Sequence, residues 1–405
     1  MTKHVATTLR LNGLAIGLLI ATPLSAEQFD LPLRGPFPVG STNMELATPY
    51  ANASNEIVHQ LLLGPNGAED ASPFLAETLQ FPDAAWLTDV VVPADEDIYG
   101  PAQGQTLPVV TFITYPTAPD DAPNEYRFPY EDGRYGVFEN MLRPDEAPKF
   151  ADPNARYPLI ILAHGAESHG LYDVDHAHRL ASHGYVVAVI TYGDGRTYAG
   201  NPSHHVGFLR PYMTTAVLDS ILESQAFGPH VDTDNIGISG HSYGGFTALA
   251  AVGGRYNGRR ETAMDARIAA SVIAAPWVGH DSGLGGYYAF GPDNTDLRHI
   301  TVPVICFFGT KDDVTRASYI LPAMQKLSGP TYVVELVDQP HIFDGGGWRD
   351  RDKWELLFFS AYLKADSEAL KYLRTIRSMA GGSEDVQRYE FQQLPEPVEE
   401  LSAPR

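Results

Sequence analysis

The chain has 405 residues, of which 44% are hydrophobic and 19% charged, and its formal net charge is −22. This composition is typical of a globular protein with a large core, and it excludes a disordered chain and a membrane-embedded one. The length allows one large α/β domain or two ordinary ones. The acidity argues against nucleic acid as a partner and against electrostatic docking on anionic membranes.

Residues 1–26 have the pattern of a Sec signal peptide. Lys3 and Arg10 precede an apolar run over residues 14–21, and small residues lead to Ala26, after which we expect cleavage. The run is too short to span a bilayer comfortably, so we expect no integral membrane segment after signal removal. The single cysteine, Cys306, allows no intrachain disulfide and lies in an apolar run typical of a buried strand. An exported chain without disulfides indicates the periplasm or secretion into the medium.

The first part of the mature chain has an irregular pattern. Residues 42–47 and 107–115 are expected to form an antiparallel pair of strands. The segment between them, about residues 50–105, combines one short helical pattern with Gly, Pro and Asp, and we interpret it as an insertion. Residues 116–156 are rich in Pro, Asp and Tyr and are expected to form a long surface connection.

From residue 159 onward, expected strands alternate with expected helices. The expected strands cover residues 159–163, 186–191, 236–239, 268–274, 304–308 and 332–337. The expected helices cover residues 175–183, 213–225, 246–252, 317–327 and 353–364. This alternation predicts a mostly parallel central sheet with helices on both faces, in a single domain over residues 27–375. Residues 376–405, which are acidic and contain prolines, are predicted to be a mobile tail.

The most informative stretch is Gly-His-Ser-Tyr-Gly at residues 240–244, between an expected strand and an apolar helix. Gly-x-Ser-x-Gly in this context is the pattern of a nucleophile elbow, in which a sharp turn presents the serine hydroxyl at the end of a strand. Gly240 and Gly244 would lack side chains because the turn crowds both positions. A chance match is the alternative in a chain with 37 glycines, but the strand–helix context favours Ser242 as a nucleophile.

A serine nucleophile needs a base, and the base needs a carboxylate to hold its tautomer. His341 and Asp312 each follow an expected strand, in the chain order that a nucleophile elbow requires. Because parallel strands end on one edge of the sheet, the three side chains can converge there. Asp313 is the alternative acid, and the aspartate that is not used would cap the following helix or bind solvent.

The predicted oxyanion donors are the backbone N–H groups of Tyr243 and Ala166. His164, two residues before Ala166, is better explained by a structural role than as a base. The pairs His204-His205 and His176-x-His178 have no convincing third metal ligand at a fixed spacing, and we interpret them as solvated or capping histidines. No metal or other cofactor is required.

From about residue 35 to 365 the chain resembles the α/β-hydrolase superfamily. Within it, the chain is most similar to the predicted dienelactone-hydrolase and platelet-activating-factor acetylhydrolase group, and to bacterial cutinase-like polyester hydrolases. The residues that carry the resemblance are 35–40, 162–166, 180–185, 240–245, 275–277, 302–303, and the loops with Asp312 and His341. The chain departs from dienelactone hydrolases in having Ser242 where they have cysteine. It departs from cutinase-like enzymes in residues 50–105 and in lacking a disulfide.

The resemblance has further implications for the site. It places the acid at Asp312, and it implies that Trp277 lines the acyl-binding cleft, with a core tryptophan as the alternative. The Gly- and Tyr-rich loop over residues 279–296 is a candidate lid, with a plain surface loop as the alternative.

These observations predict a periplasmic or secreted serine hydrolase that cleaves a small-molecule or polymeric carboxylic ester through an acyl-enzyme. One alternative is a prolyl-oligopeptidase-like peptidase, although residues 27–105 are too few to form the propeller that restricts access in such enzymes. The other is a non-catalytic binding protein on a hydrolase fold. A missing triad residue would favour that reading, and none is missing. The sequence does not distinguish among ester substrates, because the shape of the pocket sets that choice.

Overall fold

The computed structural model describes residues 31–48, 77–94, 103–119, 124–130, 134–166, 168–192, 209–256, 264–279, 290–379 and 386–392. The predicted signal peptide, the short helical pattern after residue 50, the His204-His205 pair and residues 280–289 of the candidate lid lie outside these ranges.

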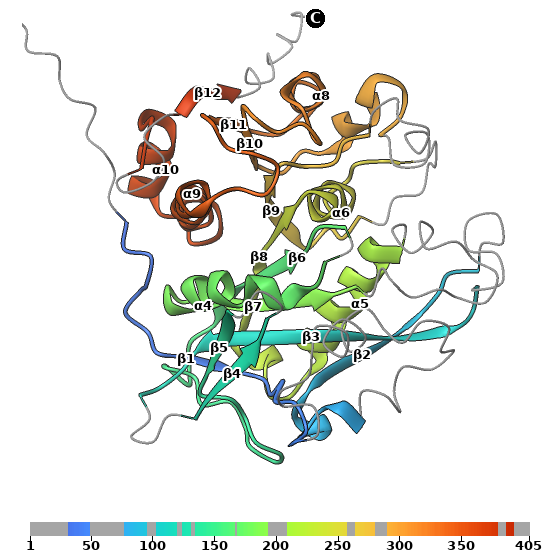
Figure 1. Ribbon diagram of the computed structural model, residues 1–405, viewed down its shortest axis with the longest axis vertical. Helices are drawn as coiled ribbons and strands as arrows, with labels where there is room; N and C mark the ends of the chain where they lie inside the picture. Colours follow the sequence, from blue (N-terminus) through green and yellow to red (C-terminus); the bar gives the residue numbers. More distant parts are fainter. Residues whose placement is uncertain are drawn as a thin grey trace, which may run out of the picture.

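Ten strands of the described residues form one central sheet (Figure 1). Its parallel part consists of β6 (Tyr157–Ala163), β7 (Val186–Thr191), β8 (Val231–His241), β9 (Ile268–Ala274), β10 (Val304–Gly309) and β11 (Thr331–Leu336). Along the sheet the order is β1-β3-β7-β6-β8-β9-β10-β11-β12, with β2 also paired to β3. The predicted mostly parallel sheet is therefore confirmed, and β8, the strand before Ser242, lies in its middle.

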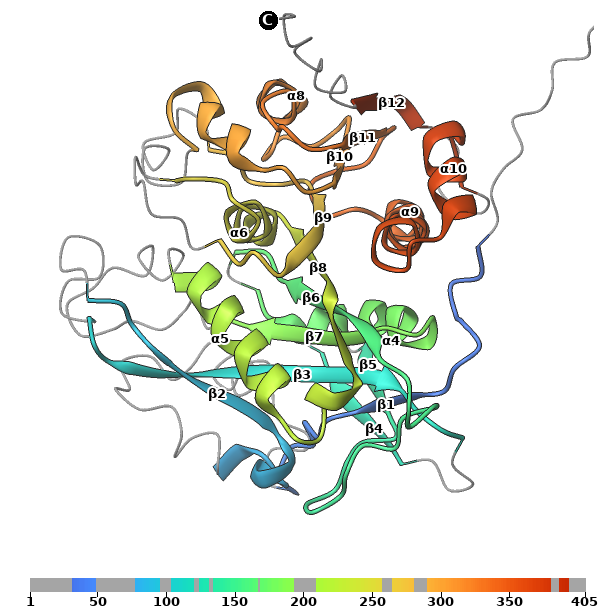
Figure 2. The same ribbon diagram turned by 180° about the vertical axis from the view of Figure 1, so that it is seen from behind.

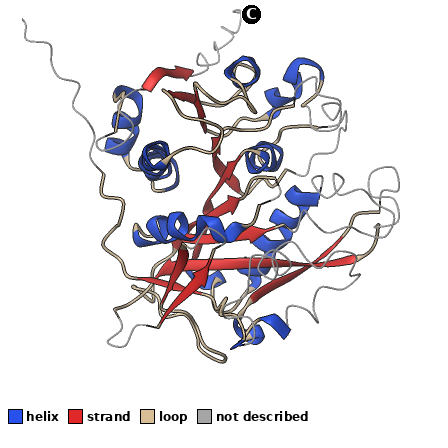
Figure 3. Cartoon of the chain, in the orientation of Figure 1, coloured by secondary structure: helices blue, strands red, loops and turns tan. Residues whose placement is uncertain are grey.

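Helices cover both faces of this sheet, as Figures 2 and 3 show. One face carries α4 (Val174–Ser182), α9 (Gly345–Leu363) and α10 (Ser367–Thr375), and the other carries α5 (Arg210–Glu223), α6 (Tyr243–Ala251) and α8 (Ala317–Met324). Among the described residues there are also 3-10 segments, η2 (Pro82–Ala84), η4 (Gly170–Asp173), η6 (Gly228–His230) and η7 (Pro292–His299). Each face has its own apolar core, with Leu180 and Phe358 in one and Ile221 and Phe246 in the other. This layering explains why β6, β7, β10 and β11 are buried along their whole length.

The antiparallel strands near the N-terminus differ in part from the prediction. β3 (Thr106–Pro116) pairs with β1 (Val39–Ser41), so the expected pair exists, but its first strand is residues 39–41 and not 42–47. β2 (Trp86–Val91) also pairs with β3, so part of the segment interpreted as an insertion is a strand of the central sheet, which the sequence analysis did not predict. Thr88 and Val90 are buried between exposed neighbours. Such an alternation is a strand signal, which the surrounding Gly, Pro and Asp residues obscured.

Two further segments are more ordered than predicted. Within the expected surface connection, β4 (Glu125–Pro129) and β5 (Tyr135–Glu139) form a hairpin that buries Phe128 and Phe138. Within the predicted mobile tail, β12 (Val386–Gln392) pairs antiparallel with β11, and the rings of Phe391 and Tyr332 stack with centroids 4.5 Å apart. The tail prediction is wrong for these residues because the prolines on which it rested all follow the strand.

Two smaller predictions concern the described residues. Cys306 lies in β10 and is fully buried, as expected, and burial raises the pKa of its thiol. Among the described residues, no helix combines the length and the apolar character that crossing a membrane requires.

Candidate active site

The turn between β8 and α6 consists of Ser242. Its φ of 55° and ψ of −115° lie in a region that residues with a side chain rarely adopt. The Ser242 carbonyl oxygen accepts hydrogen bonds from the backbone N–H groups of Gly245 and Trp277, both at 2.9 Å. The strained backbone is therefore held by the first turn of α6 and by the segment after β9, as a nucleophile elbow requires.

The glycines on either side of Ser242 are sterically required. A Cβ atom on Gly244 would lie 1.9 Å from the carbonyl oxygen of Ala163, and one on Gly240 would lie 2.2 Å from the carbonyl oxygen of Gly244. Both obstacles are backbone atoms, so they cannot move aside as a flexible side chain would. The close approach of β6 to the elbow therefore depends on Gly244, and the tight turn of the elbow itself depends on Gly240.

We expect Gly244→Ala to displace the elbow. The added methyl group should cost about 1–3 kcal/mol of stability, as overpacking does in other cores. Displacing the Ser242 hydroxyl should slow its reaction with a fluorophosphonate probe by roughly 10²-fold. Urea unfolding and the labelling rate measure the two effects. Gly345→Ala is the matched control, because the nearest heavy atom to its added Cβ is 3.8 Å away. Labelling of Gly244→Ala at the wild-type rate would contradict the prediction.

The structure brings Ser242, His341 and Asp312 into one chain of hydrogen bonds. His341 lies in the loop after β11 and Asp312 in the loop after β10. His341 Nε2 is 2.9 Å from Ser242 Oγ, and His341 Nδ1 is 3.0 Å from Asp312 Oδ2. A carboxylate only accepts, so Nδ1–H donates to Asp312, which leaves Nε2 to accept from the serine hydroxyl. This arrangement can take a proton from Ser242.

The Asp312 carboxylate is buried and fully engaged. Its Oδ1 accepts from the backbone N–H groups of Val314 and Thr315, at 2.9 and 2.8 Å, and its Oδ2 is 2.7 Å from the Thr315 hydroxyl. Burial alone would raise the pKa of Asp312, but hydrogen bonds from His341 and Thr315 outweigh it and hold the pKa below its usual value. Asp313, the alternative acid, is exposed on the same loop.

A second histidine, His241, supports the His341 loop. His241 Nε2 is 2.8 Å from the carbonyl oxygen of His341, and its ring packs against Trp348 with centroids 5.5 Å apart. Loss of solvation lowers the pKa of His241 to about 4, so the imidazole is neutral near pH 7 and donates Nε2–H to that carbonyl. No local sequence pattern indicates this role of His241, because it depends on a contact 100 positions away.

The loop after β6 lies against the nucleophile. A Cβ atom on Gly165 would lie 3.6 Å from the Ser242 Cβ, and Ala166, the predicted oxyanion donor, follows in an exposed turn. His164 is buried; its Nε2 accepts from the backbone N–H of Tyr192 at 3.1 Å, and its Nδ1 is 2.7 Å from the Gly165 carbonyl oxygen. Both ring nitrogens thus bond to backbone, which fits the structural role expected for His164.

Trp277 lies directly after β9 and is half-buried. Its backbone N–H bonds to Ser242, and its side chain packs against the apolar cluster that contains Phe246. The side chain is therefore partly packed on the core, as in the alternative considered for it, and partly exposed. A role in substrate binding stays a prediction.

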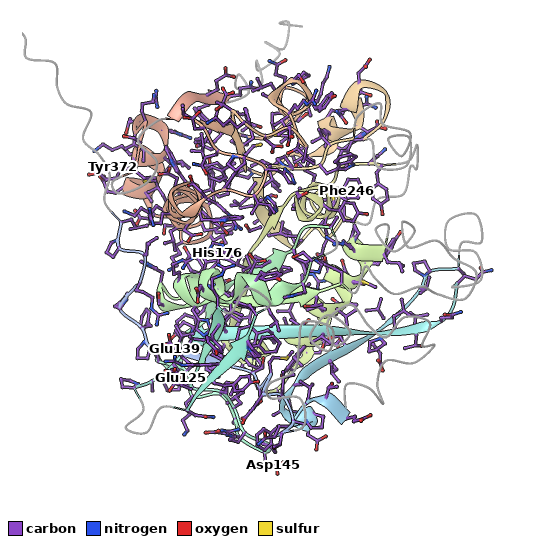
Figure 4. All side chains as sticks on the ribbon, viewed as in Figure 1. Glu125, Glu139, Asp145, His176, Phe246 and Tyr372 are labelled. Atoms are coloured by element: carbon purple, nitrogen blue, oxygen red, sulfur yellow. The ribbon has the colours of Figure 1, made fainter. Side chains whose placement is uncertain are left out.

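The His176-x-His178 pair on α4 is neither solvated nor capping, so that interpretation is wrong. The inner face of α4 packs on the sheet and buries both side chains. His178 Nδ1 donates to the Val174 carbonyl oxygen at 2.8 Å. His176 lies between two carboxylates of α9, with Nδ1 2.6 Å from Asp352 Oδ1 and Nε2 3.2 Å from Glu355 Oε2. His176 is labelled in Figure 4. Within the described residues, no group of three His, Cys, Asp or Glu side chains is arranged to hold a metal ion.

Comparison with known proteins gives distant relatives. No model of a known protein family matches the chain. Over 247 residues, 54% of this chain, it is 25% identical to the protein described as "Uncharacterized peptidase YuxL" from Bacillus subtilis (strain 168). Over 200 residues, 45% of this chain, it is 27% identical to "Probable dipeptidyl-aminopeptidase B" from Ajellomyces capsulatus (strain H88). The matched regions span 35% and 21% of those two proteins.

These relatives belong to the α/β-hydrolase superfamily, and the mostly parallel sheet with helices on both faces agrees with that fold. The predicted α/β-hydrolase fold is confirmed. Both relatives are described as peptidases, so they support the superfamily and a distant relationship to peptidases. The narrower resemblance to dienelactone hydrolases, platelet-activating-factor acetylhydrolases and cutinase-like enzymes stays a prediction.

Proposed function

We propose that this protein is a serine hydrolase that cleaves amide bonds in peptides. The observation that carries the hydrolase proposal is the hydrogen-bond chain from Ser242 through His341 to Asp312. The choice of peptide over ester rests on the two relatives, both of which are described as peptidases. The peptidase alternative of the sequence analysis thus takes precedence over ester cleavage.

Acylation begins at the Ser242 hydroxyl. Its oxygen attacks the substrate carbonyl carbon while its proton passes to His341 Nε2, and the carbonyl electron pair moves onto oxygen. The backbone N–H groups of Tyr243 and Ala166 would donate to that oxyanion. Collapse of the tetrahedral intermediate breaks the C–N bond, and the leaving amine takes the proton from His341. The acyl group then remains on Ser242 as an ester.

Deacylation repeats these steps with water. His341 takes a proton from the water molecule that attacks the acyl ester, and returns it to Ser242 Oγ as the carboxylic acid leaves. Asp312 keeps the proton of His341 on Nδ1 and stabilises the imidazolium that forms in each half-reaction. The lowered pKa of Asp312 suits this role, because the carboxylate must stay ionised throughout.

Hydrolysis of carboxylic esters is the second candidate, and one structural observation favours it. Ile342, directly after His341, is 69% exposed, and Val314, near Asp312, is 43% exposed. Exposed apolar side chains thus lie within two residues of Asp312 and of His341 in the sequence. A site bordered by such side chains would suit an acyl chain or a large apolar peptide side chain.

The test compares a p-nitroanilide and a p-nitrophenyl ester that carry the same N-acetylphenylalanyl group. A peptidase hydrolyses both, because an activated ester is the easier substrate of the same acyl-enzyme pathway. Hydrolysis of the ester with no turnover of the anilide would replace the proposal with the ester candidate. If folded protein turns over neither substrate and Ser242 takes no fluorophosphonate label, the non-catalytic binding protein is the better reading. Ser242→Ala is the control for background hydrolysis in both assays.

A further inference from the structure

Arg210, the first residue of α5, is a fully buried arginine beside the elbow. Its Nη1 donates to the carbonyl oxygen of His164 at 2.7 Å, and its Nη2 donates to the carbonyl oxygen of Gly165 at 3.0 Å. Its guanidinium carbon also lies 4.4 Å from the ring centroid of Tyr243. One side chain thus contacts the two chain segments that hold the predicted oxyanion donors.

The contacts with the β6 loop determine the direction of its N–H groups. In a trans peptide unit the C=O and N–H bonds point in opposite directions. The Gly165 carbonyl and the Ala166 N–H share one peptide unit, so a hydrogen bond from Arg210 to that oxygen fixes the direction in which the N–H points. The planar fork of an arginine can hold two successive carbonyl oxygens at once, which a lysine ammonium cannot do with the same geometry.

The contact with Tyr243 acts on the other donor. The Tyr243 ring lies against the guanidinium on one side and stacks on Phe246 on the other, with centroids 5.3 Å apart and planes inclined by 8°. Tyr243 is the first residue of α6 and directly follows Ser242. Fixing the Tyr243 side chain restricts the backbone that carries the Tyr243 N–H, the other predicted oxyanion donor.

The environment of Arg210 explains how a cation can be buried here. A buried charge costs free energy unless its donors are satisfied. Two carbonyl oxygens and two aromatic rings, Tyr243 and Tyr192, surround the guanidinium, and its carbon is 4.7 Å from the Tyr192 centroid. Thr214, one turn later on α5, bonds to the Arg210 carbonyl oxygen and to the Tyr192 hydroxyl, both at 2.8 Å. Thr214 thus belongs to the same group of side chains, and these two hydrogen bonds join it to Arg210 and Tyr192.

We propose that Arg210 is a positioning residue for the oxyanion hole, which it orders by holding the His164–Gly165 carbonyls and the Tyr243 ring together. The proposal rests on the proposed serine hydrolase function. It predicts that Arg210 affects the tetrahedral state more strongly than the binding of the substrate in its ground state.

The test uses Arg210→Met and Arg210→Lys in the full chain, with p-nitrophenyl acetate as substrate and phenylboronic acid as a tetrahedral adduct former. We expect Arg210→Met to lower kcat roughly 10²-fold, the loss seen when one oxyanion donor is removed, while KM changes less than about threefold. The affinity for phenylboronic acid should fall in parallel with kcat. Arg210→Lys should recover less than a tenth of the lost activity, because the ammonium does not bridge both carbonyls.

Ile221→Val is the control, because it disturbs the buried packing of the same helix, three turns away from the guanidinium; its kcat should stay within about twofold of wild type. Urea unfolding shows which variants are folded. If Arg210→Met does not fold, Arg210→Lys gives the answer by itself. Wild-type kcat and boronate affinity in a folded Arg210 variant would overturn the proposal. A wild-type protein without turnover or Ser242 labelling would instead overturn the proposed function, so the two failures are distinguishable.

Discussion

Replacing Ser242 with alanine should lower kcat by roughly 10⁵–10⁶-fold, the range expected when the nucleophile of a triad is lost. His341→Ala should have an effect of the same size, because the hydroxyl then has no base 2.9 Å away. The double variant should be no slower than either single variant, since the two residues act as one unit. The measurement is kcat for the fastest substrate of the wild-type protein, on variants shown to be folded. A further large loss in the double variant would mean that the two side chains act independently.

The neighbouring aspartates provide a matched pair for the same experiment. Asp312→Asn should lower kcat roughly 10⁴-fold, because an amide at this position favours the wrong tautomer of His341. Asp313→Asn changes the same atoms one residue later on an exposed surface, and we expect kcat within about twofold of wild type. Equal losses in the two variants would contradict the assignment of Asp312 as the acid.

The central sheet and its helices were predictable because their signals are local. From residue 157 onward, every expected strand and helix has a counterpart in the structure, since apolar runs and helical periodicity follow directly from burial on a covered sheet. Boundaries were less predictable. α9 begins at Gly345, eight residues before the predicted start, because Asp344 caps it and Gly347 lies against Gln339, where a Cβ atom would be 2.2 Å from the amide oxygen. Three successive glycines are poor helix formers, so their sequence gave no helix signal.

In the candidate site, too, residues with a local sequence signal were predictable and residues that act through distant contacts were not. Ser242, Asp312 and His341 each follow a strand and so could be placed from the sequence pattern alone. Arg210 and His241 could not, because each acts through backbone carbonyls of residues far away in the sequence. Thr315 gave a weaker local signal, since a threonine three residues after an aspartate commonly closes a turn onto its carboxylate. Residues that position the reacting groups therefore required the structure.

A buried charge network joins α4 to α9 on the opposite face of the sheet from Arg210. His176 contacts Asp352 and Glu355; Arg179 Nη2 is 2.6 Å from Asp352 Oδ2, and Arg351 Nε is 3.2 Å from Glu355 Oε2. Arg351 also donates to Ser239 Oγ at 2.9 Å, three residues before Ser242 on β8. The network thus ties both helices to the strand that carries the nucleophile.

The pH dependence of this network follows from its pKa shifts. Burial alone would lower the pKa of His176, but Glu355 and Asp352 outweigh it and raise the pKa above its ordinary value near 6.5. Protonated His176 therefore stabilises the fold fully below about pH 6.5, and this contribution is lost as the pH rises through the folded-state pKa. Burial alone would raise the pKa of the Asp352 and Glu355 carboxyls, but His176 outweighs it and holds both pKa values below their ordinary values. The contribution of these carboxylates to stability is therefore lost only in acid. Asp173, directly before α4, differs from these two carboxyls, because burial raises its pKa. Ionisation of Asp173 therefore destabilises the fold as the pH rises.

His176→Leu should therefore destabilise the protein by about 3–5 kcal/mol at pH 6, because it leaves two carboxylates buried without their shared cation. The loss relative to wild type should be smaller at pH 9, because the contribution of protonated His176 declines once the pH exceeds the ordinary pKa near 6.5. Urea unfolding of both proteins at the two pH values measures the difference. Lys371→Ala, which removes an exposed ion pair with Glu368, is the control and should change stability by less than about 1 kcal/mol at either pH. A loss that is equal at pH 6 and pH 9 would show that His176 contributes packing but no charge, and the carboxylates would then depend on Arg179 and Arg351 alone.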